Sequence, residues 1–379
     1  MIFKLSPGEQ TQLEKIKTLI SKEIKKNGKI TFARYMELAL YTPLLGYYSS
    51  CRPKFGKEGD FVTAPEISPL FALCLAQFCK EVSHSLPHFQ ILEIGAGRGS
   101  LACDILQTLF QEKMLPEKYF ILEISDFLKQ EQKNKIKTAC PHLLNHVEWR
   151  KNLPTDFNGV ILANEVMDAF PVHRVYLDEQ GIQEYYVSEK ENHFVWTLGK
   201  PSTPLLETEI KKNNFSELPY VTEINLLFPT WISNLGNCLK EGVVLLFDYG
   251  YPRQEYYHPE RKTGTLRCHY QHHAHDNPLI LTGLQDITAH VNFTQVAESA
   301  EQAGFELLGF TTQAHFLLNM NVLSYLNENL NLSQQAKRLI FPGEMGESIK
   351  VMGLGKNFDE PLQGFSMQDQ KYRLWTIPS

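Results

Sequence analysis

The sequence lacks the features that mark membrane proteins and nucleic-acid-binding proteins. Its longest apolar runs, such as residues 242–247, fall far short of the roughly 18 residues that a membrane-spanning helix needs. Positive charge is not in excess, because 37 Lys and Arg residues stand against 43 Asp and Glu residues, for a net charge of −6. A polyanion would need a basic surface. We therefore expect neither membrane insertion nor nucleic-acid binding.

Several catalytic and metal-binding signatures are also missing. The chain has no G-x-S-x-G elbow, phosphate-loop consensus or H-E-x-x-H motif, which argues against hydrolase, nucleotidase and zinc-protease functions. Its seven cysteines are scattered without a C-x-x-C pair, so we expect most of them to be buried rather than to bind zinc. The N-terminus carries Pro7 and Glu9 where a signal peptide would have an apolar core. We therefore predict a cytoplasmic protein.

What the sequence does contain is the alternation of an α/β protein. Hydrophobic residues make up 43% and charged residues 21% of the 379 residues, as in ordinary folded proteins. From residue 88 onward, apolar runs of strand length alternate with amphipathic stretches of helix length, which indicates βαβ units and a mostly parallel sheet. The expected strands span 89–94, 119–124, 146–150 and 159–166, and the expected helices span 100–111 and 126–138.

The segments outside this alternating pattern are expected to form a cap, several insertions and a tail. Residues 1–87 are expected to form a helical N-terminal cap, whose first helix opens with a capping box at Ser6 and Glu9. A helix is also expected over residues 222–240, kinked or divided at Pro229. The predicted divisions are a core at 88–358, a β-rich insertion at 173–217, a histidine-rich loop at 251–285, a helical insertion at 312–344 and a C-terminal tail at 359–379.

The most informative segment is ILEIGAGRGS, residues 91–100, in which a strand ends and three glycines precede a helix. Gly95, Gly97 and Gly99 predict a tight turn at the carboxyl end of a central strand, where doubly wound sheets bind ligands. The dinucleotide fingerprint would require glycine or alanine where Ser100 stands. A tight turn that binds nothing is the alternative interpretation.

Two carboxylates narrow the choice of ligand. Glu93 ends the strand two residues before the first glycine, where it would repel a pyrophosphate but hold an ammonium group. Glu123 ends the second strand, from which a carboxylate can accept both ribose hydroxyls of an adenosine. S-adenosylmethionine fits both, because it carries an ammonium group and a ribose but no phosphate, and Arg98 would contact its carboxylate or stay solvated. A nicotinamide-dependent oxidoreductase is the rival hypothesis, which Glu93 and Ser100 oppose.

A second candidate cluster follows the expected strand at 159–166. Asn164 and Glu165 end that strand and Asp168 comes three residues later, beside the glycine loop in the expected sheet. Methyl transfer from a sulfonium requires the protein to align donor and acceptor, and a carboxylate can pair with a guanidinium and take its proton. Glu165, Asp168 and Asn164 are therefore the candidate catalytic residues. The alternatives are that Glu165 is a solvated charge and that Asp168 caps a helix or turn.

Several long motifs resemble those of the MidA-type class I methyltransferase family, which includes the mitochondrial complex I assembly arginine methyltransferase. The motifs are GYY at 46–48, GDFVTAPEISPLF at 59–71, ILEIGAGRG at 91–99, ANEVMDAFPVHR at 163–174, LFDYGY at 246–251, GTLRCHYQHHAHDNPL at 264–279 and DITAHVNF at 286–293. The resemblance implies a Rossmann-like class I methyltransferase fold and S-adenosyl-L-methionine as cofactor, with S-adenosyl-L-homocysteine as product. It also implies a protein substrate methylated on arginine.

The resemblance further implies residue roles and a biological context. The family's cofactor loop falls on Glu93, Gly95, Gly97 and Gly99, and its ribose-binding acid falls on Glu123. The segment at 59–68 would lie against the cofactor, or be a merely structural loop; the residues expected to contribute are Asp60, Phe61, Thr63 and Glu66. Because family members serve the assembly of a respiratory or other multi-subunit complex, a cofactor-binding assembly chaperone without turnover is a further hypothesis.

Histidines are the last candidate ligands. Four of them crowd into residues 269–275, but their spacing matches no metal site, so we predict no metal. In the family this loop would lie over the acceptor site. His290 and Asn292 would contact the acceptor or cap the next helix.

Overall fold

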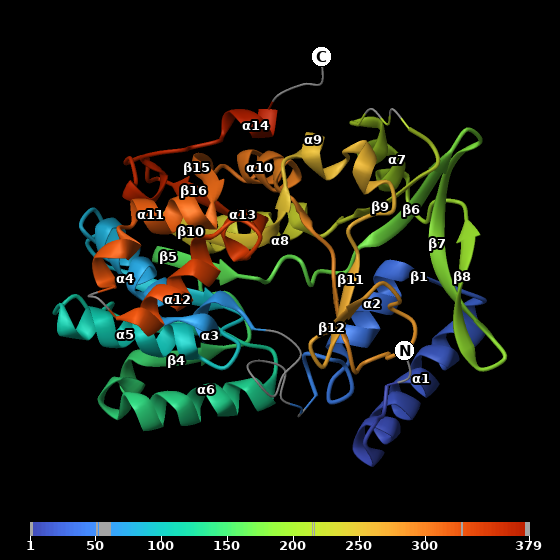
Figure 1. The fold of residues 1–379 in the computed structure, drawn as a ribbon, viewed down its shortest axis with the longest axis horizontal. Coiled ribbons are helices and arrows are strands. Elements are labelled where there is room, and N and C mark those ends of the chain that lie inside the picture. The colour runs from blue at the N-terminus through green and yellow to red at the C-terminus, as the bar shows by residue number, and fades with distance from the viewer. Residues whose placement is uncertain are drawn as a thin grey trace.

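An eight-stranded sheet forms the centre of the larger of two lobes (Figure 1). The structure is a computed structural model that describes residues 3–375 except residues 51, 53–61, 214, 216, 327 and 328. The strands run in the order β15-β16-β10-β5-β2-β3-β4, with β14 paired to β10. They are β2 (Gln90–Ile94), β3 (Tyr119–Leu122), β4 (Val147–Arg150), β5 (Phe157–Asn164), β10 (Leu239–Tyr251), β14 (Val291–Asn292), β15 (Glu306–Thr312) and β16 (Ile349–Lys356).

This strand order is that of a doubly wound sheet with one reversed strand. β2 pairs in parallel with β3 on one side and with β5 on the other, so the chain changes direction across the sheet between β2 and β5. Such a switch point leaves a crevice at the carboxyl ends of the strands. β16 runs antiparallel to both of its neighbours, β10 and β15. The α/β doubly wound fold expected from the sequence is confirmed.

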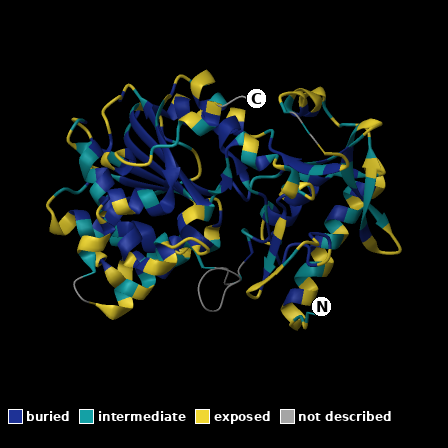
Figure 2. Ribbon diagram, turned by 45° about the horizontal axis from the view of Figure 1, so that its top comes forward, coloured by how far each residue is buried: buried dark blue, intermediate teal, exposed yellow. Residues whose placement is uncertain are grey.

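Alternate side chains of the central strands pack into two cores, one on each face of the sheet. Along β10, Val243 and Leu245 belong to one core and Val244 and Leu246 to the other. Figure 2 shows these strands as buried ribbons beneath helices whose outer residues are exposed. The first face is covered by α4 (Pro69–Ser83), α5 (Ser100–Gln111), α6 (Asp126–Ala139), α11 (Gln313–Asn319) and α12 (Leu330–Ile340), and the second by α8 (Phe228–Cys238) and α10 (Phe293–Gln302).

The smaller lobe is a five-stranded sheet against which the two N-terminal helices pack. Its elements are α1 (Pro7–Asn27), β1 (Ile30–Thr31), α2 (Phe32–Tyr41), β6 (His173–Asp178), β7 (Gly181–Lys190), β8 (His193–Gly199) and β9 (Tyr220–Ile224). β1 pairs antiparallel with β7, which joins the N-terminal segment to the β-rich stretch that begins at residue 173. The capping box predicted at Ser6 and Glu9 opens α1.

The histidine-rich segment also belongs to this lobe rather than forming an irregular connection throughout. It contains β11 (Arg267–Tyr270) and β12 (His273–His275), and β11 pairs with β13 (Asp286–Thr288). Cys268 and Ile287 share a core with Ile20 and Tyr35 of the N-terminal helices. Three segments that are far apart in the sequence therefore fold together.

The helix predicted over residues 222–240 is wrong at its start. The chain forms β9, which pairs with β6, and α8 begins only at Phe228. The boundary has a local cause, because the Asn225 side chain accepts hydrogen bonds from the amides of Leu227 and Phe228. Pro229 lies in the first turn of α8, where a missing amide costs nothing, so it neither kinks nor divides the helix.

The remaining helices are short. They are α3 (Ala64–Ile67), α7 (Pro204–Lys211), α9 (Arg253–Tyr256), α13 (Met345–Ser348) and α14 (Tyr372–Trp375). Within the described part of the chain, no helix is both long enough and apolar enough to cross a bilayer. The six cysteines at described positions are free and buried, as expected, and Cys51 lies outside the described residues.

Tyr35 ties the N-terminal helices to the histidine-rich segment, and its removal tests whether the smaller lobe is one folded unit. Its hydroxyl donates to the Pro278 carbonyl at 2.8 Å and lies 2.8 Å from the Thr282 hydroxyl, with the whole side chain buried. Tyr35→Phe should lower the free energy of unfolding by about 1–2 kcal/mol, because two buried polar groups lose a partner. Denaturant unfolding of the variant and the wild type measures this difference in free energy.

The matched control is Tyr372→Phe, since Tyr372 is 67% exposed. Equal unfolding midpoints for the two variants would contradict the structural role of the Tyr35 hydroxyl.

Candidate functional site

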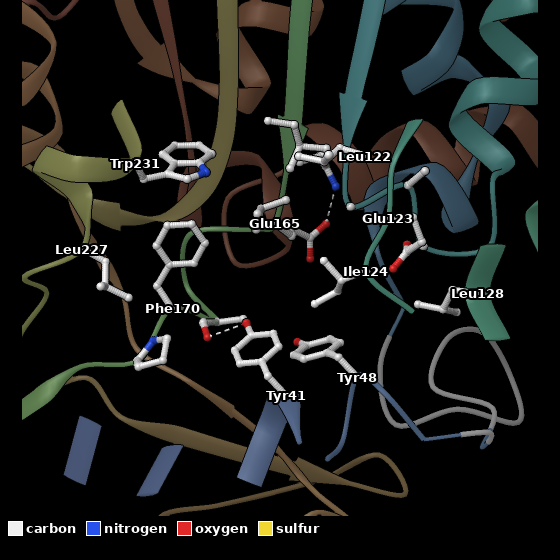
Figure 3. A pocket seen from close by; sticks show the side chains of 18 of the residues that line it. Tyr41, Tyr48, Leu122, Glu123, Ile124, Leu128, Glu165, Phe170, Leu227 and Trp231 are labelled. Carbon is white, nitrogen blue, oxygen red and sulfur yellow. Dashed lines mark hydrogen bonds between the residues drawn. The ribbon is translucent and has the colours of Figure 1, made fainter. Parts of the chain in front are cut away.

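A cavity of about 810 Å³ lies at the carboxyl ends of β2, β3 and β5, where the two lobes meet (Figure 3). The predicted site residues that line it are Thr63, Glu66, Glu93, Gly95, Gly97, Glu123, Asn164 and Glu165. Arg98 also lines the cavity and is exposed. Gly99 and Asp168 lie close behind the wall without lining it. Asp60 and Phe61 lie outside the described residues.

The glycine loop leaves β2 and packs tightly against its surroundings. A Cβ atom on Gly95 would lie 3.1 Å from a methyl group of Val166, and Gly95 has a φ of +69°, which favours glycine. A Cβ atom on Gly99 would lie 3.2 Å from the Cα of Gln132 in α6. Gly99 therefore allows helix packing, while Gly95 and Gly97 present their backbone to the cavity.

Glu93 contributes a buried carboxyl group to the cavity wall at the end of β2. It accepts a hydrogen bond of 2.8 Å from the Tyr119 hydroxyl. Burial raises the pKa of Glu93 to about 7, and the negative charge of Glu123 acts in the same direction. A buried acid of this kind favours a cationic ligand, because the ligand supplies the charge that the surroundings lack.

Glu123 is held by a hydrogen-bond network that also supports the glycine loop. One carboxylate oxygen accepts from the Ser125 amide at 2.8 Å and the other from the Gln132 side chain at 3.0 Å. The same Gln132 amide group donates to the Gly97 carbonyl at 2.9 Å, and its oxygen accepts from Trp149 at 2.9 Å. Gln132 thus links three strand ends, and no sequence signal distinguishes it, because α6 also carries the uncharged polar residues Gln130 and Asn134.

Two apolar side chains flank Glu123. Ile124 is 60% exposed although it is a large aliphatic residue, and Leu128 lines the cavity beside it. In Figure 3 both point into the cavity near Glu123. They offer an apolar surface next to a carboxylate, the combination that an adenosine base and its ribose require.

The segment around α3 closes the cavity from the N-terminal side. Glu66 accepts a hydrogen bond from the Ser100 hydroxyl and lies 4.0 Å from the Lys135 ammonium group. Thr63 precedes α3, and the amide of Ala64 donates to Glu165 at 3.3 Å. This segment therefore contacts both the glycine loop and the candidate catalytic acid.

Glu165 lies at the centre of the cavity. The Asn164 side chain donates to its carboxylate at 3.0 Å (Figure 3). Its backbone adopts a φ of +52°, an uncommon conformation for a residue other than glycine that is found at strained, functional turns. Burial raises the pKa of Glu165 to about 8, and the charge of Asp248 adds to the effect.

Asp248, from β10, holds the loop that follows Glu165. One of its oxygens accepts hydrogen bonds from three successive amides, those of Val166 at 3.1 Å, Met167 at 2.7 Å and Asp168 at 3.3 Å. Asp168 itself is buried, and this burial together with the charges of Asp248 and Asp286 raises its pKa well above the usual range. Neither the role of Asp248 nor its contact with the loop was apparent from the sequence, where LFDYGY was only a family motif.

Two tyrosines from the smaller lobe face Glu165 across the cavity (Figure 3). The rings of Tyr41 and Tyr48 stack with centroids 5.7 Å apart. The Tyr41 hydroxyl donates to the Ala169 carbonyl and the Tyr48 hydroxyl donates to Asp286, both at 2.8 Å. Neither residue was predicted from the sequence as part of the site, although Tyr48 belongs to the GYY motif.

His290 and Asn292 lie away from the cavity wall. The Asn292 side chain accepts from the amide of Gln295 and caps α10, which is one of the two alternatives considered for it. The His290 ring stacks on Tyr249 with centroids 6.4 Å apart. Over the described residues, no group of three or more His, Cys, Asp or Glu side chains is arranged to hold a metal ion.

The cavity therefore suits S-adenosyl-L-methionine. The buried Glu93 can receive an ammonium group, Glu123 can receive ribose hydroxyls, and Ile124 with Leu128 can cover a purine. A ligand pocket of about 300–1,000 Å³ is typical for one small molecule. The volume of about 810 Å³ is at the upper end of that range, and the wall continues past Glu165 into the smaller lobe.

The chain is similar to several known proteins. The model of a family of S-adenosyl-L-methionine-dependent methyltransferases matches residues 70–311. The protein arginine methyltransferase NDUFAF7 homolog, mitochondrial, of Drosophila melanogaster is 30% identical over 91% of this chain and 87% of its own length. The protein arginine methyltransferase NDUFAF7, mitochondrial, of Homo sapiens is 29% identical over 97% of this chain and 87% of its own. A crystal structure from Burkholderia thailandensis, bound to S-adenosyl-homocysteine, is 35% identical, with a TM-score of 0.94 over 98% of this chain and 100% of that one.

These similarities settle the cofactor and correct one prediction. The animal relatives are named as mitochondrial proteins, which contradicts the cytoplasmic location predicted from the sequence. The family uses S-adenosyl-L-methionine and not a nicotinamide cofactor. The resemblance to the MidA-type family is confirmed, and this chain belongs to the family of S-adenosyl-L-methionine-dependent methyltransferases.

Proposed function

We propose that this methyltransferase modifies an arginine side chain of another protein and that Glu165 orients the acceptor. The observation that carries the proposal is the buried carboxyl group of Glu165, which has a raised pKa and lies in the middle of the cavity between Glu123 and Phe170 (Figure 3). The names of the Drosophila and human relatives support arginine as the acceptor. The family resemblance supports a subunit of a multi-subunit complex as the acceptor protein.

The donor side is formed by residues of the larger lobe. Bound S-adenosyl-L-methionine supplies an electrophilic methyl group on its sulfonium sulfur. Glu93 holds the ammonium group and Glu123 accepts the ribose hydroxyls, while Gln132 keeps Glu123 in place. The further donor-side residues of this proposal are Gly95, Gly97, Gly99, Thr63 and Glu66.

The acceptor side is formed around Glu165. As the new C–N bond forms and the C–S bond breaks, the guanidinium loses a proton, which the Glu165 carboxylate takes up. Asn164 orients that carboxylate, and Asp168 is the second candidate carboxyl group, buried near it with a pKa raised well above the usual range. The ring faces of Tyr41 and Tyr48 attract the cation across the cavity.

The first test replaces the proposed base. Glu165→Gln keeps the size of the side chain but removes the proton acceptor, so methyl transfer should fall by about 100-fold or more. The assay measures labelling of a discrete polypeptide by methyl-labelled donor in a lysate that lacks this protein. S-adenosylhomocysteine should still raise the melting temperature of the variant.

If Glu165→Gln labels the polypeptide as strongly as the wild-type protein does, the proposed role of Glu165 is wrong. If the wild-type protein labels no polypeptide, an assembly chaperone without turnover is favoured instead.

The second test uses pH. Because the carboxyl group must be ionised, kcat/KM of the wild-type protein should rise about tenfold per pH unit below pH 8 and level off above it, following the pKa of about 8 of Glu165. The arginine acceptor stays protonated throughout this range. A pH profile that is flat between pH 6 and 8 would contradict the assignment.

The same titration makes a separate prediction for stability. The folded-state pKa of Glu165 is about 8 and its ordinary value is 4.5, so the wild-type protein loses stability progressively as the pH rises from about 4.5 to about 8, because the unfolded chain ionises there while the folded one keeps the proton. The melting temperature of Glu165→Gln should therefore fall less between pH 5 and pH 8 than that of the wild type. Parallel thermal melts of the two proteins measure the difference.

The third test addresses the donor side. S-adenosylhomocysteine at 100 times its dissociation constant should stabilise the wild-type protein by about 2.7 kcal/mol. Glu123→Ala should weaken binding at least tenfold, and the ligand-induced rise in melting temperature should shrink accordingly. The control is Glu301→Ala, an exposed glutamate on α10. An unchanged ligand response in Glu123→Ala would contradict the ribose contact.

A further inference from the structure

The cavity continues beyond Glu165 into a second part, which we call the apolar arm and define by Phe170, Leu227 and Trp231. In Figure 3 these three side chains lie on one side of Glu165, while Glu123, Ile124 and Leu128 lie on the other. A donor that occupies the Glu123 side therefore leaves the apolar arm unfilled. The proposed function gives no role to this part of the cavity.

The apolar arm is a preformed surface that is open to solvent. The rings of Phe170 and Trp231 meet edge to face, with centroids 5.2 Å apart and an interplanar angle of 87°. α8 carries Trp231 and is anchored in the core beneath the sheet. Leu227 is 44% exposed at the start of α8, an unusual position for a large aliphatic side chain that lines a cavity.

The charges around the cavity identify the kind of molecule that can enter. The described lining residues include five glutamates, which are Glu37, Glu66, Glu93, Glu123 and Glu165. Arg34, which also lines the cavity, is paired with Glu23 and Glu37 at 2.8 Å each, so its charge is compensated, and Arg98 is exposed to solvent. The cavity thus favours a cationic occupant with an apolar neighbour.

We propose that the apolar arm binds a bulky apolar side chain next to the target arginine, in an extended segment of the acceptor protein. This inference rests on the proposed function, because the arginine is placed at Glu165. The arm would then select among arginines by their neighbours. Trp231 and Leu227 would be the residues that determine specificity.

Peptide binding tests the proposal without requiring turnover. Two fluorescently labelled pentapeptides are compared by anisotropy, with the protein saturated by S-adenosylhomocysteine: one carries phenylalanine on both sides of a central arginine, the other glycine. The phenylalanine peptide should bind at least tenfold tighter, because its rings leave water for an apolar surface. Trp231→Ala should bring the ratio of the two peptide affinities close to one. Leu227→Ser should also reduce this ratio, and it serves as a second variant if the tryptophan variant folds poorly.

The matched control is Trp375→Ala, which removes a tryptophan that is 46% exposed on α14 and is not among the residues lining the cavity. It should leave the ratio of affinities unchanged. Equal affinities of the two peptides for the wild-type protein, or binding of neither, would overturn the proposal.

Two further outcomes keep the alternatives apart. If the wild-type protein is a dimer in sedimentation and Trp231→Ala is a monomer, a second copy of the chain occupies the arm and the proposal fails. If the peptides behave as expected but no polypeptide is labelled in the lysate assay, the arm is confirmed as a binding site while the proposed methyl transfer fails.

Discussion

The hydrogen bonds of one buried carboxylate, that of Asp248, support the arrangement on which the proposed chemistry depends. Three successive amides of the loop after β5 donate to Asp248, and the amide of Glu165 donates to the Phe247 carbonyl at 2.8 Å. These contacts come from β10, the parallel neighbour of β5. Because the loop is held from the side, Glu165 can keep its uncommon backbone conformation at the centre of the cavity.

Three further buried acids favour positively charged ligands in the cavity. Glu93, Glu165 and Asp168 are enclosed in a region of low polarity, where each ionised form is costly and each pKa rises. Cationic ligands relieve this cost, since both the sulfonium donor and a guanidinium acceptor carry positive charge. In our proposal the ionised forms of these acids are therefore favoured most when donor and acceptor are both bound.

The two lobes contribute different parts of the cavity. In our proposal the larger lobe forms the donor side through the glycine loop and the ends of β2 and β3, where doubly wound sheets bind ligands. The smaller lobe brings Tyr41 and Tyr48 to the face opposite Glu165, with hydroxyl groups bonded to Ala169 and Asp286. Acceptor recognition in our proposal therefore depends on how the lobes pack.

The residues on the proposed donor side of the cavity could be found from the sequence because their signals are local. The glycine spacing, Glu93 and Glu123 stand within or directly after apolar runs, and the period of those runs defines the strand ends that carry them. The error at 222–240 arose because a strand and a helix follow each other with one short turn; the pairing of β9 with β6 fixes the strand, and the Asn225 side chain caps the start of the helix.

The acceptor side was decided by tertiary structure. Tyr41, Glu165 and Trp231 are separated by dozens of residues and come together only because distant segments pack against one another. The sequence by itself determined the α/β core, the glycine loop and the acids at the strand ends, since those follow from local periodicity and spacing. The neighbours of Glu165, its raised pKa and the apolar arm follow from long-range packing, which no local pattern encodes.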